Sequence, residues 1–532
     1  MWFNLKTIPG RVFLALLTAL LLWAAWPAGG CAPLLFIALI PLLLLEESIA
    51  SSKKEGQKIN LFWYAYLSFF TFNLITTFWI WYASPFGMFG AVMANALLMT
   101  IIFQLFHITK RRLGVNWGYA SLIVYWMAGE MLHMDWDLSW PWLNLGNGFA
   151  AWANMVQWYE YTGTLGGTLW VWLVNILLFS VVTGTSLQKR KQLICVLGLI
   201  IIPVIISWTI RWNYKEEVRP VEVVAVQPNV DPYNEKFSGN SDEQLNRMLR
   251  LASTLVTPKT RLVIFPETAL PDGIWEEHME QHRQIKRIRE FLGLHPGLRL
   301  LTGLTSFKMY QQGEKVSLTA RQYGETTDSF DAYNTGMQIG ADGKVQLHHK
   351  SKLVPGVEKM PFPALFSYIG DFAIDLGGTA GSLGVQDHPS VFTGDSISAA
   401  PVICYESIYG DYLAQYVREG ANIICIMTND GWWSDTPGYR QHCQYARLRA
   451  IETRRSIARS ANTGISCFVD QKGDLFQKTG WWVPAVIRQE LNLNNRITFY
   501  ARFGDYLGRI ALGISVLLAG ATIIQRFRKS FR

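Results

Sequence analysis

Apolar segments long enough to cross a membrane dominate the first 212 residues of this 532-residue chain. A helix needs roughly 20 mostly apolar residues to cross the ~30 Å hydrocarbon core of a bilayer. Seven such segments lie in the first 212 residues, and an eighth lies near the carboxyl end. They are predicted at residues 12–27, 32–45, 61–82, 87–106, 117–134, 169–185, 193–212 and 506–525. The chain is therefore predicted to contain a multi-span α-helical membrane bundle.

Between the seventh and eighth spans the composition changes, and apolar strand-like runs alternate with charged helical stretches. No internal repeat, Gly/Ser linker or low-complexity tract divides this block, so we expect one globular α/β domain anchored at both ends. The predicted domains are a membrane domain at 1–212, a globular domain at 213–505, and a terminal span with a short basic tail at 506–532.

The basic residues predict the orientation in the membrane, because Lys and Arg in short loops tend to stay on the cytoplasmic side. Every second loop is basic, whereas the stretch 135–167 has neither Lys nor Arg. Both termini are therefore predicted to be cytoplasmic and the globular domain to lie outside. This pattern accounts for the net charge of +8, so no nucleic-acid partner is predicted. The basic clusters are Lys6 and Arg11; Lys53, Lys54 and Lys58; Lys110, Arg111 and Arg112; Lys189, Arg190 and Lys191; and Arg526, Arg528, Lys529 and Arg532.

Two other interpretations concern the cysteines. The run Ala28-Gly29-Gly30-Cys31 resembles a lipoprotein cleavage site, which would make the first segment a cleaved signal. An apolar span follows at once and the charge alternation needs the first span, so we favour a retained helix. The six cysteines are irregularly spaced and do not indicate a disulfide framework.

Three segments of the globular domain place a reactive side chain near an apolar strand-like run. Glu267 follows 262–266, Lys350 lies in a basic stretch before Leu353, and Cys404 follows 399–403. Singly, these residues are typical of a loop end, a surface cation and a small core side chain. Together they supply a base, a cation and a nucleophile.

The combination suits acyl transfer through a thioester. A carboxylate can accept the thiol proton, and an ammonium favours the thiolate and stabilises the oxyanion of a tetrahedral intermediate. The other cysteines of the domain suit this role less well. Cys425 lies inside an apolar run, Cys443 in an Arg-rich helical segment and Cys467 in a strand-like run, so packing is predicted for all three.

With these motifs the domain resembles the nitrilase superfamily, whose fold is an αββα sandwich. Its position between seven spans and one terminal span resembles the apolipoprotein N-acyltransferase family, and this resemblance covers essentially the whole chain. It rests on Phe265-Pro266-Glu267, Lys350 before Leu353-Val354-Pro355, and Cys404-Tyr405-Glu406, with further similarity at 226–229, 302–303, 333–334, 428–432 and 449–464.

The resemblance implies that Glu267 is the base, Lys350 the oxyanion-stabilising cation and Cys404 the nucleophile. It also implies supporting roles at the active site for Tyr405 and Glu406.

Glu358 matches a third supporting carboxylate, although its surroundings differ from the family pattern. The family usually has Leu-Val-Pro-Phe-Gly-Glu, whereas this chain reads Leu-Val-Pro-Gly-Val-Glu at 353–358, and Lys352 stands where a His is common. The spacing to Glu358 is unchanged, so its role is retained.

Aromatic residues are expected to guide the lipid substrate. The resemblance suggests Phe237 as a lid residue, with the register shifted by one position. The apolar stretch 360–369 contains two prolines and is predicted to be a loop. Either it packs on the domain core, or Phe362 and Phe366 lie at the membrane face and guide acyl chains.

The implied reaction has two steps. Cys404 takes the sn-1 acyl chain of a phospholipid, typically phosphatidylethanolamine, and the thioester then acylates the α-amine of the S-diacylglyceryl-cysteine of a lipoprotein. This is the last step of lipoprotein maturation, at the bacterial inner membrane with the domain facing the periplasm. Neither a cofactor nor a metal is predicted.

Two rival functions remain. One is a membrane-anchored amidase or nitrile hydrolase, for which eight spans are excessive. The other is a transporter with an external sensing domain. Ion or proton coupling usually needs ionisable residues within the spans, and Glu130 is nearly alone there, so the sequence disfavours transport.

Overall fold

The structure is a computed structural model that describes residues 6–54, 57–184, 186–362 and 382–530. The chain forms two compact units. The membrane unit comprises Met1–Trp81, Pro85–Asn213 and Phe503–Arg532. The α/β unit comprises Tyr82–Ser84 and Tyr214–Arg502.

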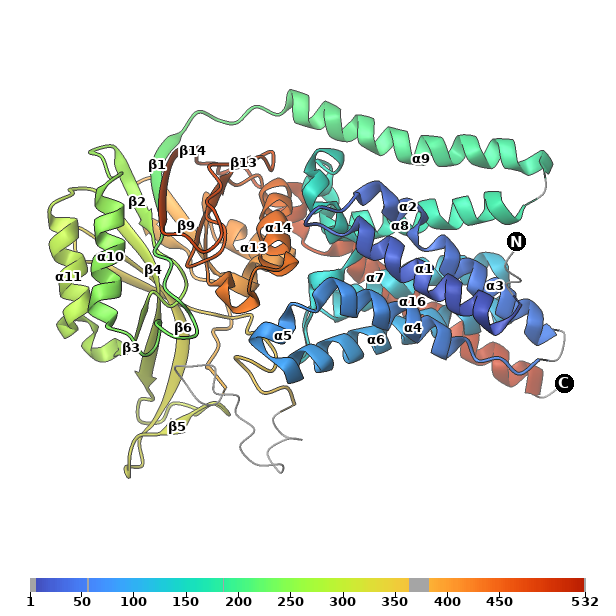
Figure 1. Ribbon diagram of the computed structural model, residues 1–532, viewed down its shortest axis with the longest axis horizontal. Coiled ribbons are helices and arrows are strands. Elements are labelled where there is room, and N and C mark those ends of the chain that lie inside the picture. The colour runs from blue at the N-terminus through green and yellow to red at the C-terminus, as the bar shows by residue number, and fades with distance from the viewer. Residues whose placement is uncertain (1–5, 55–56, 185, 363–381, 531–532) are drawn as a thin grey trace. The chain divides into compact units, whose positions relative to one another are not determined.

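Long helices make up most of the membrane unit (Figure 1). They are α1 (Ile8–Ala25), α3 (Ile40–Lys54), α4 (Leu61–Thr77), α6 (Pro85–Leu113), α7 (Val115–Leu132), α8 (Tyr159–Thr183), α9 (Ser186–Asn213) and α16 (Tyr506–Ser530). Shorter helical segments are η1 (Ala32–Leu34), α2 (Leu35–Ala38), α5 (Ile80–Ala83), η2 (Pro141–Leu143) and η3 (Leu145–Met155).

Six helical segments of the described residues are long and apolar enough to cross a membrane, and the chain is a multi-pass membrane protein. They are Ile8–Ala25, Ala32–Ser52, Pro85–Leu113, Tyr159–Thr183, Lys189–Asn213 and Tyr506–Phe527. The other two predicted spans coincide with α4 and α7, which have 17 and 18 residues. Neither is among the six segments, so the count of eight remains a prediction.

The membrane unit contains a buried cluster of charged residues that links α3 to α6. Glu46 is fully buried and accepts hydrogen bonds from Lys110 at 2.5 Å and pairs with His107 at 2.7 Å. Lys110 also contacts Glu47 at 2.8 Å. The helices of the membrane unit therefore contain buried ionisable residues besides Glu130, more than the sequence indicated. Direct pairing explains how these groups are tolerated in an apolar setting.

The α/β unit is built on two sheets (Figure 1). The eight-stranded sheet has the order β14-β1-β2-β4-β6-β5, with β3 paired to β4 and β7 to β6. The six-stranded sheet has the order β13-β12-β11-β10-β9-β8. The strands of the first sheet are β1 (Pro220–Gln227), β2 (Thr260–Ile264), β3 (Leu270–Trp275), β4 (Arg299–Met309), β5 (Arg321–Gln322), β6 (Ser329–Gly340), β7 (Val345–His349) and β14 (Ala485–Asn492). Those of the second are β8 (Phe392–Gly394), β9 (Ile397–Ile403), β10 (Ile423–Thr428), β11 (Ile457–Ala461), β12 (Cys467–Val469) and β13 (Leu475–Phe476).

The central strands are apolar on both faces because both faces are covered. Along β2, Leu262 and Ile264 pack in the core between the two sheets, where β9 contributes Ala399 and Ile403. Val263, on the alternate face, packs against the helices outside the first sheet. Successive side chains of a strand point to opposite faces. One apolar run therefore packs both in the core between the sheets and in the core under the outer helices.

Helices cover the outer face of each sheet. On the first sheet lie α10 (Ser241–Ser253) and α11 (Arg283–Gly293). Helix α10 buries Leu245, Met248, Leu249 and Ala252 at the spacing of one helical face, and α11 does the same with Ile285, Ile288 and Leu292. On the second lie α13 (Gly410–Arg418) and α14 (Pro437–Thr453). The predicted fold class, a helical membrane bundle plus an αββα sandwich, is confirmed.

Candidate active site

Glu267 lies in the turn that follows β2. Its backbone approaches β4 so closely that a Cβ on Gly303 would lie 2.7 Å from the Glu267 Cα. Real Cβ atoms are not found at such a distance, so the turn requires glycine at position 303. Thr268, the next residue, has a positive φ of 48°. The close packing directs the carboxylate inward, and Glu267 is only 8% exposed.

Cys404 lies in the turn that follows β9, also with a positive φ of 48°. Its carbonyl oxygen accepts a hydrogen bond from Ser407 Oγ at 2.7 Å and lies 3.2 Å from His442 Nε2. A left-handed conformation is unfavourable for a residue with a Cβ and persists only where its surroundings hold it. These two contacts hold the carbonyl and so orient the Cys404 side chain.

Lys350 directly follows β7 and is fully buried between carboxylates. Its Nζ donates to Glu267 Oε1 at 3.0 Å and to Glu358 Oε1 at 2.8 Å. Asn334, on β6, donates through Nδ2 to the same two oxygens at 2.9 and 3.1 Å. The structure thus brings two carboxylates to one ammonium. Glu267 is 83 residues from Lys350 along the chain, and Glu358 is 8 residues from it.

Glu358 reaches this cluster despite the altered motif around it. Its Oε2 accepts a hydrogen bond from the backbone N–H of Val354 at 2.8 Å. Gly356 has a φ of +77°, which favours glycine, and lies in the turn between these two residues. The Gly-Val pair therefore supports a local turn that returns Glu358 to Lys350.

Glu406 is fully buried and joins the Cys404 turn to the Lys350 segment. Its Oε2 accepts from the backbone N–H of Ile403 at 2.8 Å, and its Oε1 from that of Ser351 at 2.7 Å. One carboxylate therefore holds the residue before Cys404 and the residue after Lys350. Such charge-assisted bonds are roughly twice as strong as neutral ones.

The electrostatics favour a neutral thiol beside an ion pair. Burial raises the pKa of Cys404 above its usual range, and the Glu267 carboxylate adds to this while Lys350 opposes it. Burial opposes the charge of Lys350, yet Glu267 and Glu358 hold its pKa well above the usual value. Burial likewise opposes ionisation of Glu267, but Lys350 and Lys236 together lower its pKa. The resting site is therefore a thiol, an ammonium and two carboxylates.

Lys236 is a second buried cation that the sequence did not reveal. Its Nζ donates to the carbonyl oxygen of Glu267 at 3.0 Å, and burial lowers its pKa to about 8. The same Nζ lies 5.6 Å from the ring centre of Phe237. The predicted lid residue Phe237 is therefore next to a group that contacts Glu267. In the sequence, the residues that flank Lys236 do not distinguish it from a surface lysine.

A second buried network lies behind the Cys404 turn. Asp430 Oδ2 accepts from Arg459 Nη2 at 2.7 Å, and its Oδ1 lies 2.9 Å from His442 Nδ1. Burial opposes the charge of Asp430, but Arg459 and His442 lower its pKa far below the usual range. His442 Nε2 in turn lies 2.8 Å from Ser407 Oγ. A fixed carboxylate thus orients the ring that faces the Cys404 carbonyl.

The remaining predicted residues have different settings. Tyr405 is buried beside Cys404, with its ring centre 5.4 Å from that of Tyr409. Phe362 is half-buried and has a φ of 50°. Phe366 lies outside the described residues. The predicted packing of Cys425, Cys443 and Cys467 is confirmed, since all three are buried, and the last two sulfurs are 3.8 Å apart.

Comparisons with known proteins agree with this architecture. Residues 223–499 match the carbon-nitrogen hydrolase family, and residues 18–177 match the apolipoprotein N-acyltransferase N-terminal domain. An apolipoprotein N-acyltransferase of Chlorobaculum tepidum is 32% identical, with 97% of each chain covered. One from Geobacter metallireducens is 26% identical over 94% of this chain and 93% of the relative.

Among solved structures, Saccharomyces cerevisiae Nit3 of the nitrilase superfamily matches 52% of this chain and 92% of its own, at 16% identity and a TM-score of 0.38. The two family matches lie on the two structural units, and the first relative matches along nearly the whole length. The chain belongs to the apolipoprotein N-acyltransferase family.

Proposed function

We propose that this acyltransferase works by double displacement, with Cys404 as the nucleophile, Glu267 as the base and Lys350 as the oxyanion-stabilising cation. The observation that carries the proposal is the bonded cluster of Glu267, Lys350 and Glu358. The charges of Glu267 and Lys350 act on the Cys404 thiol. The acyl donor is the sn-1 ester of a phospholipid such as phosphatidylethanolamine. The acceptor is the α-amine of the S-diacylglyceryl-cysteine of a lipoprotein.

In the first half-reaction the Cys404 sulfur attacks the carbonyl carbon of the ester while the thiol proton passes to Glu267. The carbonyl oxygen becomes an oxyanion beside Lys350. Two N–H groups of Lys350 donate to carboxylates of the described residues, which leaves the third for the oxyanion. When the intermediate collapses, the glycerol oxygen leaves with the proton from Glu267. The products are a thioester and a lysophospholipid.

In the second half-reaction the α-amine of the lipoprotein attacks the thioester carbon. Glu267 accepts a proton from the amine, and Lys350 again stabilises the oxyanion. The Cys404 sulfur then leaves and regains a proton from Glu267, which yields an amide and the starting enzyme. A thiol leaves more easily than an alcohol, so the covalent intermediate divides one difficult transfer into two easier steps.

The other polar residues position this machinery. Glu358 and Asn334 hold Lys350 and Glu267 through hydrogen bonds of 2.8 to 3.1 Å, and Glu406 ties the nucleophile turn to the Lys350 segment. Tyr405 packs beside the nucleophile. Since the Cys404 side chain is only 8% exposed, bulk water has little access to the thioester. That exclusion favours transfer over the hydrolysis of an amidase, the rival reaction.

We propose that Phe237, Phe362 and Phe366 contact the substrate around this site. Phe237 lies beside Lys236, which donates to the Glu267 carbonyl. Phe362 is half-buried at the end of a described segment, and Phe366 lies outside the described residues.

The donor is tested with a phosphatidylethanolamine whose two acyl chains differ in mass. Incubation with the purified enzyme, without acceptor, is expected to give one adduct with the mass of the sn-1 chain, removable by hydroxylamine. The matched control is the same lipid with its two chains exchanged, which should exchange the adduct mass. An adduct with the sn-2 chain, or with both chains equally, would contradict the assignment.

We also propose that residues 1–212 form a membrane domain, 213–505 a periplasmic catalytic domain and 506–532 a terminal span with a cytoplasmic tail in the inner membrane. The alternating basic clusters support this orientation. Alkaline phosphatase, active only outside the cytoplasm, is expected to work when inserted at exposed Gly313 and to fail when fused after Arg532. The reverse pattern would place the chemistry in the cytoplasm.

A further inference from the structure

The proposed reaction gives no task to Lys236, although this cation lies beside the base. Lys236 is only 5% exposed. A lysine ammonium is a compact and strongly hydrated charge, and it is almost never buried unless it is paired. Keeping such a charge in the interior of the α/β unit therefore indicates a specific role.

The backbone around Lys236 is fixed by hydrogen bonds. Lys236 lies in a run of turns between β1 and α10, and its backbone N–H donates to the carbonyl oxygen of Asp231 at 2.9 Å. Gln244, on α10, donates through Nε2 to the carbonyl oxygens of Glu235 at 3.0 Å and Lys236 at 3.3 Å. The backbone of Lys236 is thus bonded through both its N–H and its carbonyl group. The fold, rather than solvent, therefore sets where the side chain points.

The ammonium of Lys236 reaches the turn that carries the base. Its Nζ donates to the carbonyl oxygen of Glu267 at 3.0 Å. The backbone N–H of Asn429 donates to Glu267 Oε2 at 3.1 Å. In the amide orientation that its neighbours favour, the side-chain oxygen of Asn429 also accepts from Lys236 Nζ at 3.2 Å. Lys236 and Asn429 together therefore hold Glu267 at both its backbone and its carboxylate.

Lys236 also balances the charge of the active site. The titratable groups that act on it are Glu267, Cys404 and Lys350. With Lys236 present, the two carboxylates of Glu267 and Glu358 face two ammonium groups, whereas without it they face only that of Lys350. An unbalanced negative charge favours the protonation of a buried carboxylate. Both ammonium groups accordingly lower the pKa of Glu267.

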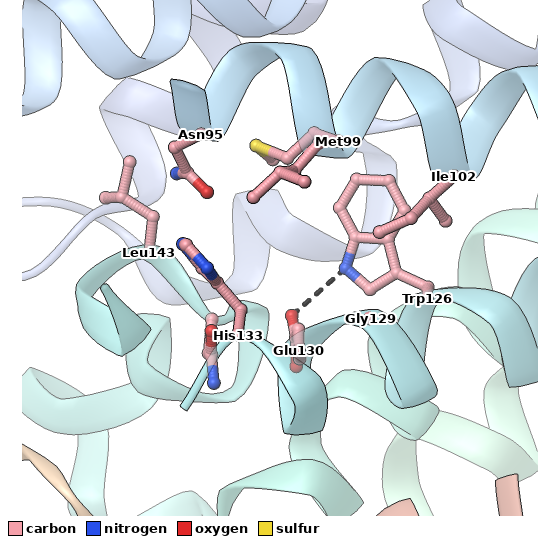
Figure 2. Close-up of a pocket in the computed structure, with 10 residues that line it drawn as sticks. Asn95, Met99, Ile102, Trp126, Gly129, Glu130, His133 and Leu143 are labelled. Atoms are coloured by element: carbon pink, nitrogen blue, oxygen red, sulfur yellow. Dashed lines mark hydrogen bonds between the residues drawn. The ribbon is translucent and has the colours of Figure 1, made fainter. Parts of the chain in front are cut away.

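A buried carboxyl group does not need a cation to satisfy its hydrogen bonds, as Glu130 in the membrane unit illustrates. Glu130 is only 7% exposed, and Figure 2 shows its bond with the indole N–H of Trp126, at 3.0 Å. Its other donors among the described residues, Thr168 Oγ1 at 2.6 Å and the Leu145 backbone N–H at 2.8 Å, are also neutral. Glu267 has two ammonium groups instead. The contrast indicates that the second cation serves the ionisation of Glu267.

We propose that Lys236 is a positioning residue for the base, which fixes the Glu267 turn through its backbone and keeps the Glu267 carboxylate ionised through its positive charge. This role rests on the proposed function of Glu267 as the base. Lys236 itself forms and breaks no covalent bond. Burial lowers the pKa of Lys236 to about 8, so its charge is present at lower pH and lost at higher pH. The charge is therefore present throughout the acidic range in which Glu267 would otherwise take up a proton.

Lys236→Met in the full-length enzyme tests this role, because methionine fills a similar space and carries no charge. The measurement is the single-turnover rate of acyl-adduct formation from phosphatidylethanolamine between pH 5 and pH 9. At pH 6 the variant is expected to be roughly tenfold slower than the wild type, on the scale of losing one neighbouring charge. Its rate should recover toward the wild-type rate as the pH rises, because Glu267 then ionises without the cation. A purely structural defect would lower the rate by the same factor at every pH.

Two further variants separate charge from packing. Lys236→Arg keeps the charge, so the acidic limb of its pH–rate profile should stay where it is in the wild type, even where the larger side chain lowers the rate at every pH. Lys236→Gln is neutral but can still donate to the Glu267 carbonyl, so its acidic limb should move as in Lys236→Met. The matched control is Lys259→Met. Lys259 is exposed and precedes β2, whose other end leads to Glu267, and its profile should match the wild type.

An acidic limb that stays at the wild-type pH in a neutral variant with a normal melting temperature would overturn the proposal, whatever the rate. A displaced limb in Lys236→Arg would overturn it as well, and that result decides if neither neutral variant folds. The wild-type adduct and its suppression in Glu267→Gln are measured in the same assay. A failure of the proposed function would appear there, and would thus be distinguished from a failure of the role of Lys236.

Discussion

Cys404→Ala is expected to abolish the hydroxylamine-labile acyl adduct that the purified enzyme forms with phospholipid. In the proposed mechanism the acyl chain is transferred to the Cys404 sulfur, and alanine offers no nucleophile in its place. Intact-mass spectrometry should show a single unmodified species, which corresponds to a loss of at least roughly 10³-fold in adduct, on the scale seen when a covalent nucleophile is removed.

The matched control is Cys425→Ala. Cys425 lies in the same α/β unit, is fully buried and packs in the core between the sheets. Its removal is expected to leave the adduct in place, with some loss of stability. An adduct that persists in Cys404→Ala would mean that another side chain carries the acyl group.

Lys350→Met is expected to slow thioester formation by roughly 10²–10³-fold, as for the loss of one oxyanion-stabilising donor. The substitution also leaves the Glu267 and Glu358 carboxylates facing one another without the cation between them. Their repulsion raises the pKa of Glu267, which Lys350 normally lowers. Since the base must be ionised to accept a proton, the acidic limb of the pH–rate profile should move to higher pH.

Single-turnover rates of adduct formation between pH 5 and pH 9 measure both effects. Lys352→Met is the matched control, because Lys352 is two residues away and its Nζ lies 5.5 Å from the ring centre of Tyr409. A combined Glu267→Gln and Lys350→Met variant should be little slower than either alone, as residues that act as a unit are not additive. A near-normal rate with an unshifted acidic limb would remove Lys350 from the oxyanion role.

The order of elements along the chain was sufficient to predict the fold class. Apolar runs of about 20 residues indicate spans whatever they pack against, because the length needed to cross a bilayer is a local property. The number of spans was harder to predict. Helices α4 and α7 are not among the six segments that are long and apolar enough to cross a membrane, and their fit to a bilayer depends on neighbouring helices and lipid.

The sequence by itself determined the candidate residues for the proposed chemistry. Glu267 and Cys404 each end an apolar strand-like run, and Lys350 follows a strand, so their types and positions could be recognised before any contact was known. The sequence could not show whether Glu358 still reaches the active site despite the altered motif around it. Only the turn at Gly356 and the 2.8 Å contact with Lys350 establish that its carboxylate reaches the cluster.

Only the tertiary structure decided which other groups surround these candidate residues. Lys236 resembles any solvated lysine in the sequence, and His442 lies 38 residues from the carbonyl it faces. Their importance comes from burial and from partners that are distant along the chain. Periodicity reports the face of a helix or strand on which a side chain lies, whereas the distance between two faces depends on how whole sheets and helices pack.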